Sequence, residues 1–173
     1  RLAAINKGYN KALGKIITVY ETPTKLQTAE EYFYRAYNKD KNGDYYGAIA
    51  DYTKAIELSP NSVVYNNRGS AKHDLKDYYG AISDSTKAIE LDPNYAMAYS
   101  NRGVSKNNLE DYYGAISDYN KAIELDPNYA MAYVNRGIAK ELRGDMSGAC
   151  ADWKKAANLG HTDAAKWAAN QCN

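Results

Sequence analysis

The 173-residue sequence has little of several residue types on which catalysis, metal binding or membrane insertion depend. It contains two cysteines, two histidines and four prolines, and no apolar run approaches the roughly 18 residues of a membrane-spanning helix. Neither a GxxxxGK[ST] phosphate loop nor a GxSxG nucleophile elbow occurs, so no enzyme activity is predicted. The 22 basic and 21 acidic residues leave a net charge of +1, which gives no support for a nucleic-acid partner.

Tyrosine is abundant, with 18 tyrosines against one phenylalanine, and much of it recurs at a fixed spacing. The segments 77–103 and 111–137 are nearly identical and are offset by 34 residues. An earlier copy begins at Asp44 with the same DYYGAI sequence, and a diverged copy begins at Asp145. A fixed period of this length predicts four consecutive repeat units. The two near-identical segments differ only at Ser85/Tyr119, Thr86/Asn120 and Ser100/Val134.

The first half of each unit has the periodicity of a helix. In the third unit this helix is predicted over about 97–109, where Tyr99, Gly103 and Lys106 recur at steps of four and three and form one stripe. Gly103 and Ala115 are both small, so we expect the backbones of the two helices of a unit to approach closely at this pair.

The second half of each unit predicts another helix. Asp111 precedes it and is a predicted N-cap. Ala115, Tyr119 and Ala122 form its inner stripe. The Asp-Pro-Asn sequence 126–128 is expected to end it, because proline cannot continue a helix.

This helix–turn–helix pattern resembles the tetratricopeptide repeat family over about 29–172. The family's aromatic position is held by Tyr32, Tyr65, Tyr99 and Tyr133, and its small position by Ala36, Gly69, Gly103 and Gly137. Its helix-two alanines match Ala48/Ala55, Ala81/Ala88, Ala115/Ala122 and Ala149/Ala156, and its proline matches Pro60, Pro93 and Pro127. The sequence departs from the family in two columns that usually hold Leu and Tyr, and in His161, which replaces the last proline. Those columns hold Arg35, Arg68, Arg102 and Arg136, and Lys39, Lys72, Lys106 and Lys140.

The resemblance implies an all-α fold, a right-handed solenoid of stacked helix pairs. We expect the repeats to span 28–164, as units of about 29–61, 62–95, 96–129 and 130–163. The segment 164–173 is expected to form a C-terminal capping helix. Residues 1–27 lie outside the repeat register and show an apolar stripe typical of an amphipathic helix, followed by a linker.

The arginine column is matched by an aspartate column on the second helices, Asp51, Asp84, Asp118 and Asp152. Fixed offsets of this kind predict a ladder of ion pairs between the helices of each unit. If the pairs are exposed, each contributes only about 0–1 kcal/mol. The alternative is that the arginines reach a carboxylate of a ligand.

Two groups of residues resemble metal sites. Asp40, Asn42, Asp44 and Asp51 have calcium-loop spacing, but Tyr45 occupies the position that requires glycine. Cys150, His161 and Cys172 are candidate zinc ligands, but His161 is expected at a bend, about 15 Å from either cysteine along its helix. We therefore expect no metal and no cofactor.

The concave wall of such a solenoid is formed by the first helices, and this is where a partner would bind. The column two residues after the family's aromatic points away from the second helix, and three of its members are asparagines that could hold a peptide backbone. Some family members clamp a C-terminal carboxylate with Lys and Arg, but here Phe33, Val63, Met97 and Met131 stand at those places. The candidate groove residues are Phe33, Tyr34, Tyr37, Asn66, Asn67, Ser70, Met97, Asn101, Val104, Met131, Val134, Asn135 and Ile138.

The predicted function is a non-enzymatic scaffold or adaptor that binds a protein or peptide segment through this asparagine ladder and its apolar flanks. Two alternatives remain: a self-assembly module whose groove holds another copy, and a targeting or regulatory domain of a larger protein. The paired tyrosines that open the second helices, such as Tyr112 and Tyr113, are expected to pack. Stacking on nucleic-acid bases would also need a basic groove.

The two cysteines are equally spaced from the predicted turn at His161, so an antiparallel helix pair would bring Cys150 level with Cys172. At the usual separation of packed helices they could form a disulfide. Such a bridge would favour an oxidising compartment or export, whereas two free thiols would suit the cytoplasm. The sequence leaves the compartment unknown.

Overall fold

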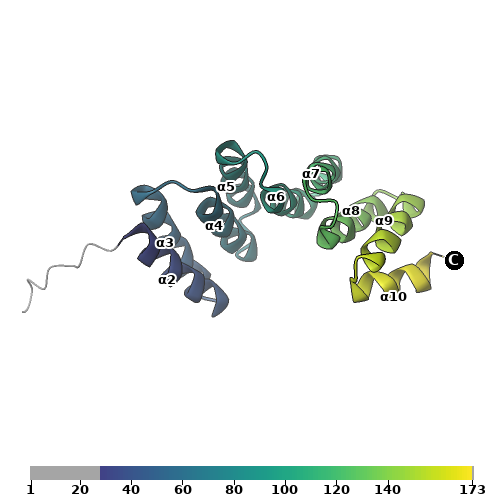
Figure 1. The fold of residues 1–173 in the computed structure, drawn as a ribbon, viewed down its shortest axis with the longest axis horizontal. Coiled ribbons are helices and arrows are strands. Elements are labelled where there is room, and N and C mark those ends of the chain that lie inside the picture. The colour runs from purple at the N-terminus through teal and green to yellow at the C-terminus, as the bar shows by residue number, and fades with distance from the viewer. Residues whose placement is uncertain (1–27, 173) are drawn as a thin grey trace, which may run out of the picture.

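The computed structural model describes residues 28–172, and throughout this range the regular structure is helical. The helices run in antiparallel pairs that stack side by side into an elongated, curved array (Figure 1). The predicted amphipathic helix in 1–27 lies outside the described residues. The helices are α2 (Ala29–Lys41), α3 (Tyr45–Leu58), α4 (Ser62–Asp74), α5 (Tyr78–Leu91), α6 (Ala96–Asn108), α7 (Tyr112–Leu125), α8 (Ala130–Leu142), α9 (Met146–Asn158) and α10 (Thr162–Gln171).

The second helix of each unit begins at an aspartate cap, as the sequence predicted. The Asp111 carboxylate accepts a hydrogen bond from the backbone N–H of Gly114 at 2.9 Å. A Cβ atom at Gly114 would collide with that carboxylate, so the glycine of the DYYG sequence leaves room for the cap. The same arrangement recurs at Asp44, Asp77 and Asp145.

The turn between the two helices of a unit needs one residue in the left-handed backbone region. Gly43 and Gly144 supply it in the first and fourth units, with φ of 80° and 82°. Lys76 and Glu110 hold the same place in the second and third units, with φ of 63° and 62°. Because a side chain is disfavoured there, the turns of the second and third units carry backbone strain that the other two turns avoid.

The core of each unit is a seam of small residues and one large ring. Ala115 and Ala122 are completely buried and Tyr119 is almost so, which confirms the predicted inner stripe. Gly103 lies against the ring of Tyr119, with Cε1 2.7 Å from the position of a Cβ atom. In the second unit the same position at Gly69 lies 3.2 Å from the carbonyl oxygen of Ala81, the counterpart of Ala115, so the expected close approach of the two backbones is found there. In the third unit the glycine also makes room for an aromatic ring.

The first helices lie on the inner side of the array. Besides its own partner, each contacts the first helix of the next unit: α2 contacts α4, α4 contacts α6, and α6 contacts α8. The second helices α3, α5 and α7 lie on the outer side. The helices α4, α6 and α8 also pack on the second helix of the preceding unit, so a first helix faces the concave groove only with the side that these neighbours leave uncovered.

The helix α10 closes the C-terminal end by packing on α9. Ala164 is fully buried, and the Trp167 ring meets the Trp153 ring edge-on at 5.8 Å between centroids. The expected capping segment started at 164, whereas the helix starts at Thr162 because the imidazole of His161 caps it, accepting from the N–H of Ala164 at 3.2 Å. Cys150 and Cys172 are joined as a disulfide, with Cα atoms 5.5 Å apart.

Candidate functional site

Several of the predicted groove residues are apolar and reach the surface. Met97 and Met131 are 46% and 44% exposed, and Tyr34 and Tyr37 are also exposed. Four further predicted groove residues are half-buried, at Phe33, Ser70, Val104 and Ile138. Exposed thioethers are unusual on a protein surface and adapt to partners of varied shape.

Two of the predicted groove residues are not on the groove surface. Asn66 is 1% exposed and Val134 is 3% exposed, so both are buried rather than available to a partner. The prediction considered only the second helix of the same unit. Asn66 is hydrogen-bonded to Tyr95 and Asn101 of the next unit. Val134 packs in the cluster that holds Trp153 of its own unit and Ala164 of α10.

The asparagine column is half-buried in the structure, and one of its members already has a partner. Asn101 donates from Nδ2 to Oδ1 of Asn66 at 3.0 Å, and Asn66 donates to the hydroxyl of Tyr95 at 3.4 Å. Asn101 therefore retains its carbonyl oxygen and one N–H for a ligand. Asn67 and Asn135 occupy the same column in the units on either side.

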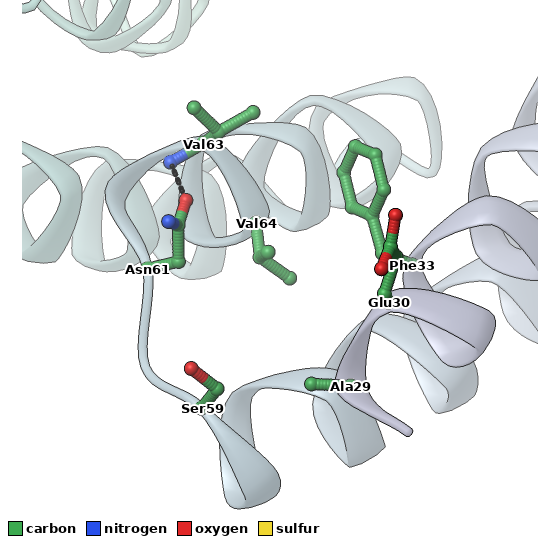
Figure 2. A pocket seen from close by; sticks show the side chains of 7 residues that line it. All are labelled: Ala29, Glu30, Phe33, Ser59, Asn61, Val63 and Val64. Atoms are coloured by element: carbon green, nitrogen blue, oxygen red, sulfur yellow. Dashed lines mark hydrogen bonds between the residues drawn. The ribbon is translucent and has the colours of Figure 1, made fainter. Parts of the chain in front are cut away.

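The N-terminal end of the groove holds a cavity of about 380 Å³ between α2 and α4 (Figure 2). Phe33 and Val63 line it, two of the residues that stand where a carboxylate clamp would have basic side chains. Among the residues that line this cavity, the only charged side chain is acidic. The lining residues are Ala29, Glu30, Phe33, Ser59, Asn61, Val63 and Val64.

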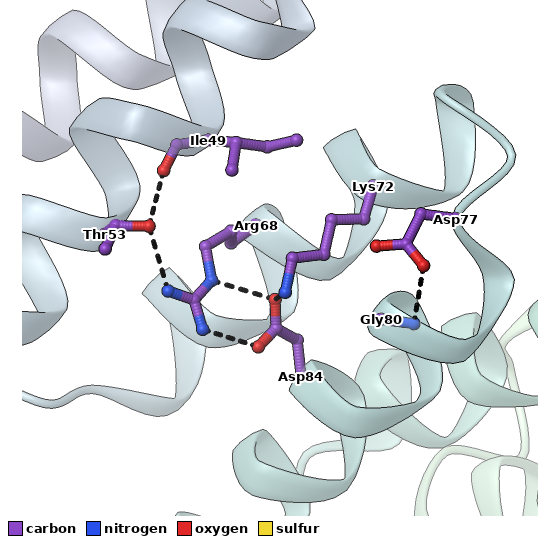
Figure 3. Close-up of polar contacts among 7 residues, drawn as sticks. All are labelled: Ile49, Thr53, Arg68, Lys72, Asp77, Gly80 and Asp84. Carbon is purple, nitrogen blue, oxygen red and sulfur yellow. Dashed lines mark hydrogen bonds and ion pairs between the residues drawn. The ribbon is translucent and has the colours of Figure 1, made fainter.

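The arginine and lysine columns lie between the helices of each unit, and the predicted ion-pair ladder is confirmed. Figure 3 shows the second unit, where Arg68 Nη2 lies 2.6 Å from Asp84 Oδ1 and Lys72 Nζ lies 2.7 Å from Asp84 Oδ2. The same three-residue arrangement recurs in the other units at Asp51, Asp118 and Asp152.

The aspartates of this ladder are buried, which differs from the exposed pairs considered in the sequence analysis. Asp84 and Asp118 are 3% and 4% exposed. In the first unit, the hydrogen bond from Arg35 holds the pKa of Asp51 below its usual value. Each carboxylate thus neutralises two cations. In units two to four these cations are largely buried, whereas the side chain of Arg35 in the first unit is 44% exposed.

Each arginine of units two to four also reaches the preceding unit. Arg68 donates from Nη1 to the hydroxyl of Thr53 at 3.0 Å, and that hydroxyl donates to the carbonyl of Ile49 (Figure 3). Arg102 bonds in the same way to Thr86, and Arg136 to Asn120. The ladder therefore joins the repeats to one another as well as the two helices of a repeat.

A second cavity, of about 180 Å³, lies in the floor of the groove between α4, α5 and α6. His73 lines it, with Nδ1 at 3.2 Å from the hydroxyl of Ser105. Burial lowers the pKa of His73 below the ordinary value of 6.5, although the nearby Asp74 acts in the opposite direction. The Tyr78 ring stacks at a tilt on the imidazole, with centroids 5.2 Å apart.

We expect the free energy of unfolding to fall as the pH is lowered below about 6.5. The folded chain holds the pKa of His73 below this value, so the unfolded chain binds the proton first. The stabilisation from neutral His73 is complete above the unfolded pKa and is lost as the pH falls toward the folded pKa. Urea unfolding at about pH 7.5 and pH 5.5 measures this, with His73→Gln as the control. An equal loss in both proteins would rule out His73 as the cause.

The two groups of residues that resemble metal sites in the sequence have other roles in the structure. Within residues 28–172 the structure shows no group of three or more His, Cys, Asp or Glu side chains placed to hold a metal ion. Cys150 and Cys172 are bonded to each other, and Asp44 and Asp51 serve as a helix cap and an ion-pair partner. Across the same range, no helix is long and apolar enough to cross a membrane.

The fold and the groove define a helical-repeat solenoid with an open concave face. Sequence models described as tetratricopeptide repeat match four segments, 29–62, 63–95, 96–129 and 118–166. Together they cover well over half of the sequence, and the chain belongs to the tetratricopeptide repeat family. No curated protein sequence matches the chain.

Several solved structures share this fold. The crystal structure of MamA is 26% identical, with a TM-score of 0.72, and the match covers 90% of this chain and 88% of MamA. The first repeat domain of Spaghetti (RPAP3), bound to the HSP90 peptide SRMEEVD, is 33% identical, with a TM-score of 0.66. That match covers 68% of this chain and 94% of the RPAP3 domain. The second repeat domain of human RPAP3, in complex with the HSP70 peptide SGPTIEEVD, is 29% identical, with a TM-score of 0.63. That match covers 65% of this chain and 94% of the RPAP3 domain.

Proposed function

We propose that the chain is a non-enzymatic protein-binding scaffold that holds a segment of a partner protein in its concave groove. The exposed apolar residues on the first helices carry this proposal. Met97 and Met131 stand one unit apart on the same face, with Val104 and Ile138 beside them. Exposed apolar patches of this kind mark interaction surfaces. The structural likeness to two repeat domains with bound peptides supports the same use of the groove.

The asparagine column would orient the partner segment. Asn67 and Asn135 offer a donor and an acceptor each, and Asn101 retains one of each after its bond to Asn66. A backbone peptide group has the matching donor and acceptor, so three asparagines at one-unit spacing suit an extended segment. The proposal therefore keeps the asparagine ladder predicted from the sequence, in which Asn101 is also bonded to Asn66.

The partner segment is proposed to be apolar or neutral rather than acidic. The two RPAP3 domains are in complex with peptides that end in the acidic sequence EEVD. Here Met97 and Met131 stand at two of the places where basic clamp residues would be expected, and the lysines and arginines of the ladder are paired with aspartates, as Arg102 and Lys106 are with Asp118. Binding should therefore depend only weakly on salt.

The test uses a peptide selected against the full chain from a random display library, with its affinity measured by calorimetry. Met131→Ala combined with Asn135→Ala should weaken this peptide by about tenfold to a hundredfold, through lost hydrogen bonds and apolar contact. The control is Tyr79→Ala, which removes a more exposed ring from the outer helix α5 and should change affinity less than about twofold.

Two results would contradict the proposal: a larger loss from Tyr79→Ala than from the groove variant, or tight binding of the peptide SRMEEVD that weakens steeply with added salt. Light scattering on the peptide-free chain addresses the self-assembly alternative. A mass that rises with concentration, and falls back in the Met131→Ala, Asn135→Ala variant, would assign the groove to a second copy.

A further inference from the structure

The cavity in the groove floor, named here the serine pocket, is built from three helices. Gly69, Ser70 and His73 come from α4, Ser85 comes from α5, and α6 completes the lining. Its volume of about 180 Å³ is room for several groups of water size, each about 30 Å³. The residues contributed by α6 are Asn101, Val104 and Ser105.

The serine pocket exists because one large side chain is missing from the second unit. The position of Ser85 is occupied in the other units by Tyr52, Tyr119 and Trp153, which are all buried to 2% exposure or less. In the third unit the Tyr119 ring fills the space beside Gly103. In the second unit no ring lies beside the equivalent Gly69. The atoms nearest to the position of its Cβ atom are the carbonyl oxygen of Ala81 and Cβ of Asp84, both at 3.2 Å, and the hydroxyl of Ser85 at 3.4 Å.

Two further positions around this space have changed in the same direction. Tyr119 packs with Ala139 and Val104 in an apolar cluster. The residues one unit earlier in the sequence are Ser105 in place of Ala139 and Ser70 in place of Val104. The position of the ring and the two positions that pack against Tyr119 are therefore all serines here. An accidental loss of one ring would leave an apolar cavity, whereas this cavity has a polar lining.

The hydrogen-bonding groups of the serine pocket are only partly satisfied by the protein. Ser85 is 1% exposed, and its Oγ has no hydrogen-bond partner among the described residues. Ser105 Oγ donates to the backbone carbonyl of Asn101 at 3.2 Å and contacts His73 Nδ1. A buried hydroxyl without a partner is rare in native proteins, and it points to a group that enters the pocket.

The lining is uncharged, which limits the chemistry of that group. The nearest ladder cations, Arg68 and Lys72, are both paired to Asp84. A carboxylate would find no cation here, and an ammonium group would find no anion. Serine hydroxyls and the Asn101 amide both donate and accept, so they match a neutral group that also does both.

We propose that the serine pocket binds a primary carboxamide, the side chain of an asparagine or glutamine in the segment held by the groove. This rests on the proposed function for its physiological ligand, although binding of a free amide does not require a partner. The pocket would then fix the register of the segment along the groove, because only the second unit has such a pocket among the four described repeats.

The first experiment uses acetamide, acetate and methylammonium as probes, each titrated into the isotope-labelled full chain and followed by NMR. Acetamide should shift the backbone amides of Gly69, Ser85 and Ser105 several-fold more than either ion. Ser85→Tyr places in the second unit the ring that the third unit holds beside its own glycine, and should abolish that response. The control Ser83→Tyr makes the same change at an exposed site of α5 and should leave it intact.

A second variant covers the case in which Ser85→Tyr does not fold. Ser70→Val with Ser105→Ala installs the counterparts of Val104 and Ala139, which pack against Tyr119, and keeps Ser85. It should reduce the acetamide response at least several-fold. Equal responses to acetate, or an unchanged acetamide response in either folded variant, would overturn the proposal.

The selected peptide separates this proposal from the proposed function. The affinity of a selected peptide that contains Asn or Gln should fall tenfold or more on Ser85→Tyr. The affinity of the same peptide with that residue replaced by alanine should not fall in this way. Both results together would show that the pocket binds the amide. If acetamide binds but the groove variant Met131→Ala, Asn135→Ala leaves peptide affinity unchanged, the pocket stands and the groove assignment fails.

Discussion

Replacing Asp118 by alanine is expected to lower the free energy of unfolding by about 3–5 kcal/mol, the range for breaking a buried ion pair from one side. The carboxylate is 4% exposed and lies 2.6 Å from Arg102 Nη2 and 2.7 Å from Lys106 Nζ. Its removal leaves two half-buried cations near each other without their anion. Arg102 remains charged when the carboxylate is lost, because the guanidinium group of arginine is not deprotonated in proteins.

The matched control is Glu124→Ala, which removes a carboxylate from the same helix as Asp118. Glu124 lies three residues after its partner Lys121. Glu124 forms a 2.7 Å pair with Lys121, but both side chains are exposed, so the same change of charge should alter stability by less than about 0.5 kcal/mol. Urea unfolding followed by circular dichroism measures both variants. A loss below about 1 kcal/mol for Asp118→Ala would mean that the buried ladder behaves like ordinary surface pairs.

The second large effect concerns the C-terminal end. Breaking the bond between Cys150 and Cys172 should lower stability by about 3 kcal/mol, because the reduced unfolded chain regains the freedom of a loop of this length. The two residues are 22 apart in the sequence, and they tie α10 to α9. Thermal unfolding with and without a reductant measures the loss, and the double variant Cys150→Ser, Cys172→Ser should be insensitive to the reductant.

The redox state itself can be checked separately. The denatured, unreduced protein should show no free thiol in a titration with a thiol reagent. Two free thiols would contradict the bond, and the chain would then lose this contribution to the stability of its last repeat.

The features predictable from the sequence are those that depend on one helix pair. The period of 34 residues, the aspartate caps and the pairing of Arg102 with Asp118 all follow from spacing within a single unit. Asn66 and Val134 were placed on the groove because the prediction ignored the neighbouring unit. In this solenoid a first helix packs on neighbouring helices as well as on its own second helix. Asn66 is buried against the next unit, and Val134 is buried in the cluster that includes Ala164 of α10.

The serine pocket was also not foreseen, although one signal for it was visible. The exchange of Ser85 for Tyr119 is one of the three differences between the otherwise identical segments 77–103 and 111–137. Its meaning depends on Ser70 and Ser105, which lie in two other helices. Only the three-dimensional arrangement shows that the three serines surround one space.

The bond between α9 and α10 also determines how the solenoid would respond to mechanical load. Tension applied at the C-terminal end would pass from Cys172 to Cys150 and enter the array at α9, so α10 would be shielded from the force. The closing helix could not peel away first, as a terminal helix in a repeat array otherwise would. The residues between the two cysteines could not be stretched, so the fully extended length of the pulled chain would be shorter by about 75 Å.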